Sequence, residues 1–190
     1  MKVSGNNTEY QHPEPGTVNA VCTRVIDLGT QEDKTGKKKR RVMLAWEIAQ
    51  LMDDQRPFLV SARFPANISP KAALGQFLEQ WRGVAFTEAE LDGFDLQKLI
   101  GAPCLLTLIK EGNYTNVKSA VKLPKGMVPL EAVGPFTHLD LDHFSAETYA
   151  ALSESLQATI AKSPEYAKAI GKGVPVAQGG QGVDPDDIPF

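Results

Sequence analysis

Five segments of this chain carry the residue pattern of β-strands, and their order along the sequence limits the folds that it can form. The clearest segment is 41–48, where Val42, Leu44, Trp46 and Ile48 alternate with residues that would face the opposite side of a strand. Runs rich in β-branched and aromatic residues also occupy 17–29, 58–64, 103–110 and 114–123. Turn-forming residues separate most of these runs, so the sequence predicts a mainly β structure.

Helical signals lie between the third and the fourth of these segments. Ser69 and Pro70 have the residue types of an N-cap and a first helical position, and an apolar stripe follows as far as Trp81. Thr87 and Glu90 have the spacing of a capping box, which predicts a second short helix. Three strands, a helical insertion and two more strands is the order of an OB-fold, a five-stranded Greek-key barrel. The predicted fold class is therefore α+β with an OB-fold, although other small barrels share parts of this order.

Composition divides the chain into four parts. Residues 1–15 are polar and contain prolines, which predicts a flexible or loosely docked arm, and 16–125 hold the predicted OB-fold. Residues 126–170 begin as a Gly/Pro-containing linker and continue as a predicted C-terminal helix that starts at Ser145. Residues 171–190 are rich in Gly, Gln, Pro and Ala, so we expect a disordered tail that ends in acidic residues.

Charge is distributed unevenly between these parts. The formal net charge of the chain is −3, but residues 16–125 hold sixteen Lys or Arg against twelve Asp or Glu, a balance of +4. Residues 126–190 hold three basic against nine acidic residues, a balance of −6. A basic body followed by an acidic C-terminal part leaves room for a polyanionic ligand of the body.

The sequence also suggests a location for the protein. It contains no apolar run of membrane-spanning length, and its first residues lack the apolar region of a secretory signal. We therefore expect a soluble, cytoplasmic protein that has no contact with a membrane. Its two cysteines, Cys22 and Cys104, lie in apolar strand-like runs and are predicted to be buried thiols.

Clustered cations are the first candidate binding feature. The turn between the first two predicted strands is flanked by Lys37, Lys38, Lys39, Arg40 and Arg41, which could neutralise phosphates at the edge of an OB-fold groove. A merely solvated turn is the alternative. Further cations on the predicted strands are assigned to the same nucleic-acid surface, namely Arg24, Arg63, Lys110 and Lys118.

Aromatic side chains are the second feature, because flat rings stack on unpaired bases of any sequence. Tyr114 alternates with Asn116 and Lys118, a polar strand face that suits a nucleic acid, and we expect these residues and Arg63 to line the groove. Trp46 shares its face with apolar neighbours, so core packing is the favoured role and base stacking the weaker alternative.

The chain closes with an acidic segment that carries an aromatic ring. Aspartates followed by Ile and Pro and then Phe offer a partner negative charge and an apolar anchor, and a pocket with an Arg or Lys rim would bind them. This segment resembles the acidic tip of bacterial single-stranded DNA-binding proteins, which are OB-fold proteins. The predicted partner-binding residues are Asp184, Asp186, Asp187, Ile188, Pro189 and Phe190. The acidic run is shorter than is usual in that family, which could alter the affinity for a partner.

The body is more similar to the divergent single-stranded DNA-binding proteins of phages and prophages. The resemblance rests on short segments, namely Trp46-Glu47-Ile48, 58–64, Phe94-Asp95-Leu96 and 123–127. It implies binding of single-stranded DNA with little sequence preference during phage DNA replication, recombination or repair in the host cytoplasm. It also implies recruitment of replication, repair or recombination proteins through the acidic tip, and it is compatible with a homo-oligomer. The alternative is an OB-fold adaptor that binds proteins only.

Catalytic motifs are weak in this sequence. A phosphate-binding Gly-rich loop, a His-Glu-x-x-His motif and a Cys-x-x-Cys pair are missing, so we expect neither an enzyme nor a cofactor. Residues with metal-ligand chemistry cluster only at His138, Asp140, Asp142 and His143, where the sequence is also typical of a strand or the start of a helix. A metal-dependent nuclease is therefore a third and weaker hypothesis.

Overall fold

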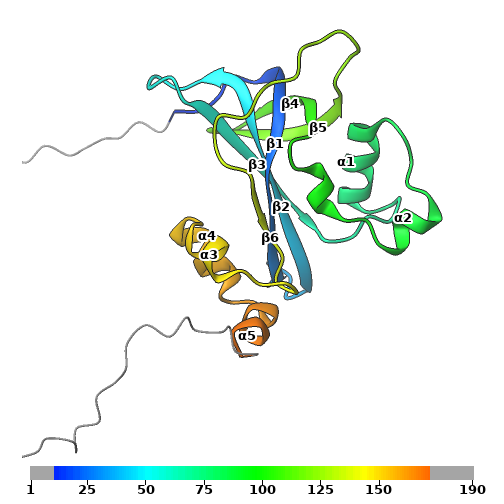
Figure 1. Cartoon of the computed structure of the whole chain (residues 1–190), viewed down its shortest axis with the longest axis vertical. Helices are drawn as coiled ribbons and strands as arrows, with labels where there is room; N and C mark the ends of the chain where they lie inside the picture. The colour runs from blue at the N-terminus through cyan, green and yellow to red at the C-terminus, as the bar shows by residue number, and fades with distance from the viewer. Residues whose placement is uncertain (1–10, 172–190) are drawn as a thin grey trace, which may run out of the picture.

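A long antiparallel sheet dominates the computed structural model, which describes residues 11–171 (Figure 1). The tail from residue 172, with the predicted partner-binding residues, and residues 1–10 of the predicted arm lie outside the described residues. The strands are β1 (Gly16–Glu32), β2 (Lys38–Leu51), β3 (Pro57–Pro65), β4 (Pro103–Glu111), β5 (Tyr114–Lys122) and the short β6 (Thr137–Leu139). The first five confirm the predicted strands. β6 is a strand in a segment that the sequence predicted to be either a strand or the start of a helix.

The strands follow the order β3-β2-β1-β4-β5, with antiparallel neighbours throughout this path. β1 pairs with β2 along most of its length and with β4 through residues 16–21, while β6 runs parallel to β1 at Arg24–Ile26. Among the described residues no ladder joins β3 to β5, although Cα atoms of these two strands approach within 8 Å. The structure is thus α+β with a mainly antiparallel sheet that is not closed by hydrogen bonds.

The predicted helical insertion lies between β3 and β4. It contains α1 (Ala73–Arg82), α2 (Glu88–Asp92) and the 3-10 helix η1 (Leu96–Leu99). The capping box is confirmed, because the Thr87 hydroxyl accepts from the Glu90 N–H and the Glu90 carboxylate accepts from the Thr87 N–H.

The predicted N-cap at Ser69 is wrong. Helix α1 begins at Ala73, and the Ser69 carbonyl instead accepts from the Ala72 N–H at 2.8 Å, which makes 69–72 a turn. This turn lies against the helix so closely that a Cβ on Gly75 would stand 2.3 Å from the Ser69 carbonyl oxygen. The missing side chain of Gly75 is what allows the turn to pack there.

One hydrophobic core fills the space between the sheet and α1. Trp46 is fully buried in it, and its ring lies 5.7 Å from that of Phe77 and 5.8 Å from that of Trp81. The Trp81 indole N–H also donates to the Pro103 carbonyl at 3.1 Å, which ties the end of α1 to the start of β4. This core confirms that the apolar face of β2 points to the interior.

A second core covers the opposite face of β1 and β2. The C-terminal part contributes α3 (Ala146–Ala150), α4 (Glu154–Ile160) and α5 (Pro164–Gly171), which lie on the other side of β1 and β2 from α1 and α2 (Figure 1). The sequence predicted one helix in this part, whereas the structure has three short ones. Ile160 is fully buried against Ile26, Leu28 and Met43, so β2 is buried on both faces between Val42 and Ile48.

Polar contacts fix the C-terminal part on the sheet. The buried Glu47 carboxylate accepts from the N–H groups of Val133 and Gly134 at 2.7 and 2.9 Å. The Glu165 carboxylate accepts from the backbone N–H and the hydroxyl of Thr30 at 2.8 and 2.6 Å. The 133–134 backbone and the Glu165 side chain of α5 are thus tied to β2 and β1.

Cys22 and Cys104 are buried, free thiols, as the sequence predicted. Burial raises the pKa of the Cys22 thiol to about 12 against a small opposing effect of its bond to the Arg24 carbonyl, and burial raises that of Cys104 as well. No helix among residues 11–171 is long and apolar enough to cross a membrane.

Candidate nucleic-acid interface

The first candidate surface is a groove of about 920 Å³ at the end of the sheet where β2 turns into β3. We call it the Tyr114 groove. Its walls come from the 52–57 turn, the first residues of β3, the first residues of β5 and Arg24 of β1. Tyr114 is 66% exposed although it is a large aromatic residue, and Asn116 follows it on the exposed side of β5. The structure therefore brings together three of the predicted residues, Arg24, Tyr114 and Asn116.

Residues 11–14 of the predicted arm are bound along this groove. The His12 ring packs edge-on against the Tyr114 ring at 5.7 Å, and Pro13 is buried with its carbonyl accepting from the Thr115 hydroxyl at 2.9 Å. The Gln11 side-chain amide bonds to Asp53. The sequence did not identify these residues as part of the site, because their contacts are made with elements distant along the chain.

The charges of the groove nearly balance. Asp54 is paired with Arg56 at 2.6 Å, and the Arg56 side chain and backbone hold the pKa of this carboxyl below its usual range. Glu47 is occupied by two backbone N–H groups. Arg24 is half-buried, and its Nε atom is buried without a hydrogen-bond partner within residues 11–171.

Lys110 flanks the same groove. It lies opposite Thr115 in the β4–β5 ladder and is exposed. Lys118 and Arg63, by contrast, do not line it. Lys118 borders a separate depression of about 500 Å³ beside α1, and Arg63 lies on β3 opposite Met43, on the outer face of the sheet. Lys118 is also the unpaired residue at the register shift of the β4–β5 ladder, since Thr107 pairs with Ser119 and Leu108 with Val117.

The lysine-rich hairpin is at the other end of β1 and β2. Lys37, Lys38 and Lys39 are exposed near the tip, where Glu32 pairs with Lys38 in the ladder. Glu47, which lines the groove, is nine residues beyond Lys38 on β2, or roughly 30 Å along an extended strand. The predicted cation cluster and the Tyr114 groove are therefore two separate surfaces.

Arg40 belongs to an internal ion network. Its guanidinium contacts Asp27 at 2.5 Å, Asp142 at 2.9 Å and Asp140 at 3.9 Å. The hydrogen bond to Asp27 is the main cause that raises the pKa of Arg40. Arg40 therefore ties the hairpin to the segment after β6. Arg41 is half-buried and lies between Gly29 and Pro65 in the sheet.

Trp46 must be removed from the candidate DNA contacts. Its side chain is fully buried, so the folded protein does not present it to a base. The reason is the one that the sequence favoured, since period-two alternation places Trp46 on the core face of β2.

The His138–His143 segment is organised around Arg40. Asp140 accepts from His143 Nδ1 at 2.8 Å, and both Asp140 and Asp142 face the Arg40 guanidinium. Among residues 11–171 no three His, Cys, Asp or Glu side chains are arranged to hold a metal ion. The carboxylates of Asp140 and Asp142 are thus paired with the Arg40 guanidinium.

Comparison with known proteins adds no assignment. No family model matches the chain, and no curated protein is significantly similar to it.

Proposed function

We propose that this protein binds single-stranded DNA with little sequence preference and that the Tyr114 groove is the central part of the binding surface. The observation that carries the proposal is the exposed ring of Tyr114, which stands beside Asn116 and Arg24 in a groove large enough for nucleotides. An exposed ring is a stacking platform for unpaired bases, and the positive charge of an Arg in the groove favours the phosphates of a bound strand.

The strand arrangement supports an OB-fold for the body. In an OB barrel β1 pairs with both β2 and β4 and a helix connects β3 to β4, as is the case here. The ligand surface of this fold uses the outer face of β2 and β3 and the loops that join β1 to β2 and β4 to β5. The Tyr114 groove lies at the second of these loops, and Lys37–Lys39 lie at the first. A DNA strand bound at the groove would need the hairpin lysines only if it continued along the sheet.

The biological setting follows the resemblance of the sequence. We place the protein in phage DNA replication, recombination or repair in the host cytoplasm, with the acidic tip as the recruiter of partner proteins. In this proposal the body has no catalytic role and needs no cofactor.

A polarisation titration tests the DNA-binding proposal. Labelled oligo-dT and a duplex of matched length are titrated with the full chain at two salt concentrations. We expect tight, salt-sensitive binding of oligo-dT and weaker binding of the duplex. Equal binding of both would contradict single-strand recognition, and no binding of either would remove DNA from the proposal.

The second candidate function is a protein-binding adaptor. It is favoured by exposed apolar side chains on the linker that follows β5, because Val128 and Val133 are each 79% exposed and Phe136 is 56% exposed. An adaptor would leave oligo-dT unbound at low salt, whereas substitution of Val128 and Val133 by Ser would abolish capture of its protein partner.

A further inference from the structure

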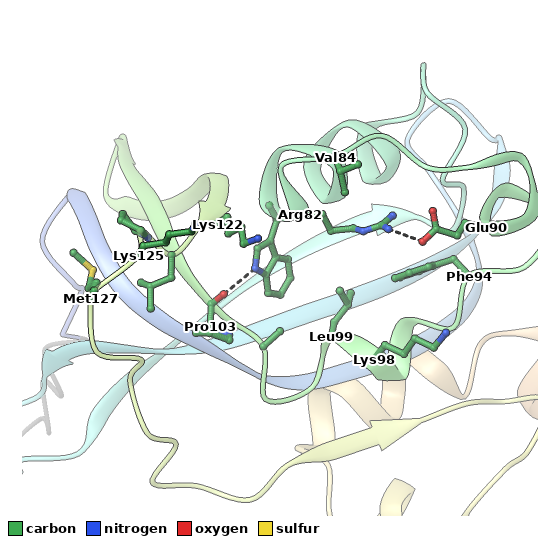
Figure 2. Close-up of a pocket in the computed structure, with 15 residues that line it drawn as sticks. Arg82, Val84, Glu90, Phe94, Lys98, Leu99, Pro103, Lys122, Lys125 and Met127 are labelled. Atoms are coloured by element: carbon green, nitrogen blue, oxygen red, sulfur yellow. Dashed lines mark hydrogen bonds and ion pairs between the residues drawn. The ribbon is translucent and has the colours of Figure 1, made fainter.

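A second pocket, of about 720 Å³, lies at the opposite end of β5 from the Tyr114 groove. The end of α1, the 3-10 helix η1, the start of β4 and residues 122–127 surround it (Figure 2). Its lining shares no residue with that of the groove. β5 has nine residues, so the two sites are roughly 25 Å apart along this strand. We call it the β5-end pocket.

The inner wall of the β5-end pocket is apolar. Trp81 and Leu99 are buried at its base, where the Trp81 indole N–H is fixed to the Pro103 carbonyl. Met127 and Val84 stand at its sides and are 44% and 57% exposed. An apolar concavity with exposed large side chains at its margin is the usual form of a site for a hydrophobic anchor.

The rim of this pocket is cationic. Lys122 and Lys125 stand on one side of it and Lys98 on the other (Figure 2). None of these three lysines has an ion-pair partner within the described residues 11–171.

One acidic side chain, Glu90, lies among the described lining residues, and Arg82 neutralises it. The two side chains are 2.5 Å apart, and the Arg82 guanidinium also packs on the rings of Phe86 and Phe94 at 4.5 and 5.2 Å. The Thr87 N–H and then Arg82 hold the pKa of Glu90 below its usual range, so it remains an anion bound to its own partners. The uncompensated charge of the rim is therefore that of the three lysines.

We propose that the β5-end pocket binds the acidic segment 184–190 of this chain. The segment offers Asp184, Asp186 and Asp187 to the lysine rim, and Ile188 and Phe190 are apolar anchors for the inner wall. The twelve residues 172–183 that connect it to α5 can span up to about 40 Å, so the segment is not confined to the neighbourhood of that helix. The inference goes beyond the proposed function and does not depend on DNA binding.

Docking at the β5-end pocket has a consequence for the DNA surface. Because the pocket is remote from the Tyr114 groove, a docked segment leaves Tyr114 and Arg24 accessible. Docking of the acidic segment in the β5-end pocket would then be compatible with DNA binding. A partner protein that binds the segment would first have to displace it from the pocket.

Nuclear magnetic resonance of the full chain tests the proposal, because the two tryptophans serve as reporter and control. Trp81 lies in the pocket and Trp46 is buried in the core. A full-chain variant with Asp186→Asn, Asp187→Asn and Phe190→Ala should show a shifted indole signal for Trp81 and shifted amide signals for residues 122–127. The Trp46 indole signal should not move. Addition of a synthetic peptide of residues 180–190 to this variant should return the signals toward their wild-type positions.

Charge reversal supplies the matched comparison. Lys122→Glu with Lys125→Glu should weaken peptide binding by about tenfold or more, because two favourable charge contacts become repulsive. Lys71→Glu with Lys162→Glu makes the same change of charge on exposed residues that line neither the pocket nor the Tyr114 groove, and it should leave peptide affinity unchanged. An unmoved Trp46 signal shows that each variant keeps its core.

Three outcomes would overturn the inference. The first is an unchanged Trp81 signal in the tail variant, which would leave the pocket without this occupant. The second is a set of shifts confined to Tyr114 and its neighbours, which would mean that the segment docks in the DNA groove. The third is a failure of the added peptide to move the Trp81 indole signal and the amide signals of residues 122–127 in this variant, which would mean that the segment does not dock there.

Discussion

Tyr114 is the aromatic residue whose exposure fits a binding role. Its ring contacts His12 and otherwise faces the groove, so its removal takes little packing from the core. Tyr114→Ala should therefore weaken oligo-dT binding by about 1–3 kcal/mol and change the midpoint of thermal unfolding little. Polarisation titration and calorimetry measure the two quantities.

Phe136→Ala is the matched control for this substitution. Phe136 is also an exposed aromatic residue, at 56%, but it does not line the Tyr114 groove. It should leave DNA affinity unchanged. Equal losses of affinity in the two variants, or a loss of stability in Tyr114→Ala with intact binding, would show that Tyr114 is not a stacking residue.

His143 should titrate above the range of an unperturbed histidine. Its hydrogen bond and ion pair with Asp140 raise the pKa of His143. Burial raises the pKa of Asp140, but the contact with His143 and the hydrogen bond from the Asp142 N–H outweigh it, so the pKa of Asp140 is lowered. Because the folded pKa is raised, the contact stabilises the protein fully at pH values below the unfolded pKa of histidine. This contribution is lost as the pH rises through the folded pKa.

Histidine ring signals in a pH titration measure this shift directly. In Asp140→Asn the His143 titration should move down toward the ordinary range of histidine. An ordinary pKa for His143 in the wild-type protein would contradict its contact with Asp140.

The alternation of residues along the strands predicted the buried side chains better than it predicted the residues that line the groove. Period two correctly placed Trp46 in the core, but the same alternation put Tyr114, Asn116 and Lys118 on one face. In the structure Lys118 borders a different depression from the other two and is the unpaired residue at a register shift of the β4–β5 ladder. A register shift leaves no mark in the sequence of one strand. The placement of His12 against Tyr114 was equally hidden, because it depends on the docking of a distant segment.

At the scale of elements, the β1–β2 hairpin separates two kinds of cation. Lys37, Lys38 and Lys39 are exposed and available to phosphates, whereas Arg40 is bound to three carboxylates. The triple substitution of the lysines by Ala should lower the slope of log affinity against log salt by about 0.7 for each phosphate that the variant no longer neutralises. Titrations of oligo-dT at four or more salt concentrations measure it.

A salt slope unchanged by the triple substitution would exclude the hairpin from the DNA surface. Lys71, an exposed lysine outside both the groove and the hairpin, gives a control substitution that should leave the slope as it is.

Arg40→Ala should act on stability rather than on the salt slope. It would leave the Asp27 carboxylate, whose side chain is only 14% exposed, without its cation. The free energy of unfolding should fall by about 1–2 kcal/mol, less than for a fully buried pair because water reaches part of the site. Denaturant titration measures the loss, and a fall in the salt slope without any loss of stability would contradict the assignment.

The elements of the body could be predicted well because each has a local signal. Strand alternation, the Thr87 capping box and the Ser145 cap, which accepts from the Thr148 N–H, all follow from residues close in sequence. The start of α1 could not, because the close packing of the 69–72 turn on Gly75 decides it. The break between α3 and α4 was missed because the stripe of apolar residues continues across it.

The whole molecule is held together by a face of the sheet that the sequence did not show to be buried. Met43 is buried on the side of β2 opposite Trp46, because apolar residues of the C-terminal part, from Leu139 to Ile160, pack into the same core. Gly29 marks how close this approach is, since a Cβ at its left-handed φ of 66° would stand 2.3 Å from the Ser163 hydroxyl. A boundary in composition near residue 125 therefore does not mark a boundary in packing.

Ile160→Ala tests whether the C-terminal part unfolds with the sheet. Ile160 is fully buried in the second core, against strands that also form the first. Loss of its side chain should lower the free energy of unfolding by about 2–4 kcal/mol, from lost transfer energy and the cavity that remains. Because β6 pairs with β1 and Glu47 binds the 133–134 backbone, the loss should appear in one cooperative transition. Circular dichroism and the fluorescence of Trp46 and Trp81, which both lie in the first core, should follow it alike. Oligo-dT binding below the transition should be unchanged, since Ile160 does not line the Tyr114 groove. Two separate transitions, with the midpoint of the fluorescence transition unchanged, would instead show that residues 126–171 are an independent unit.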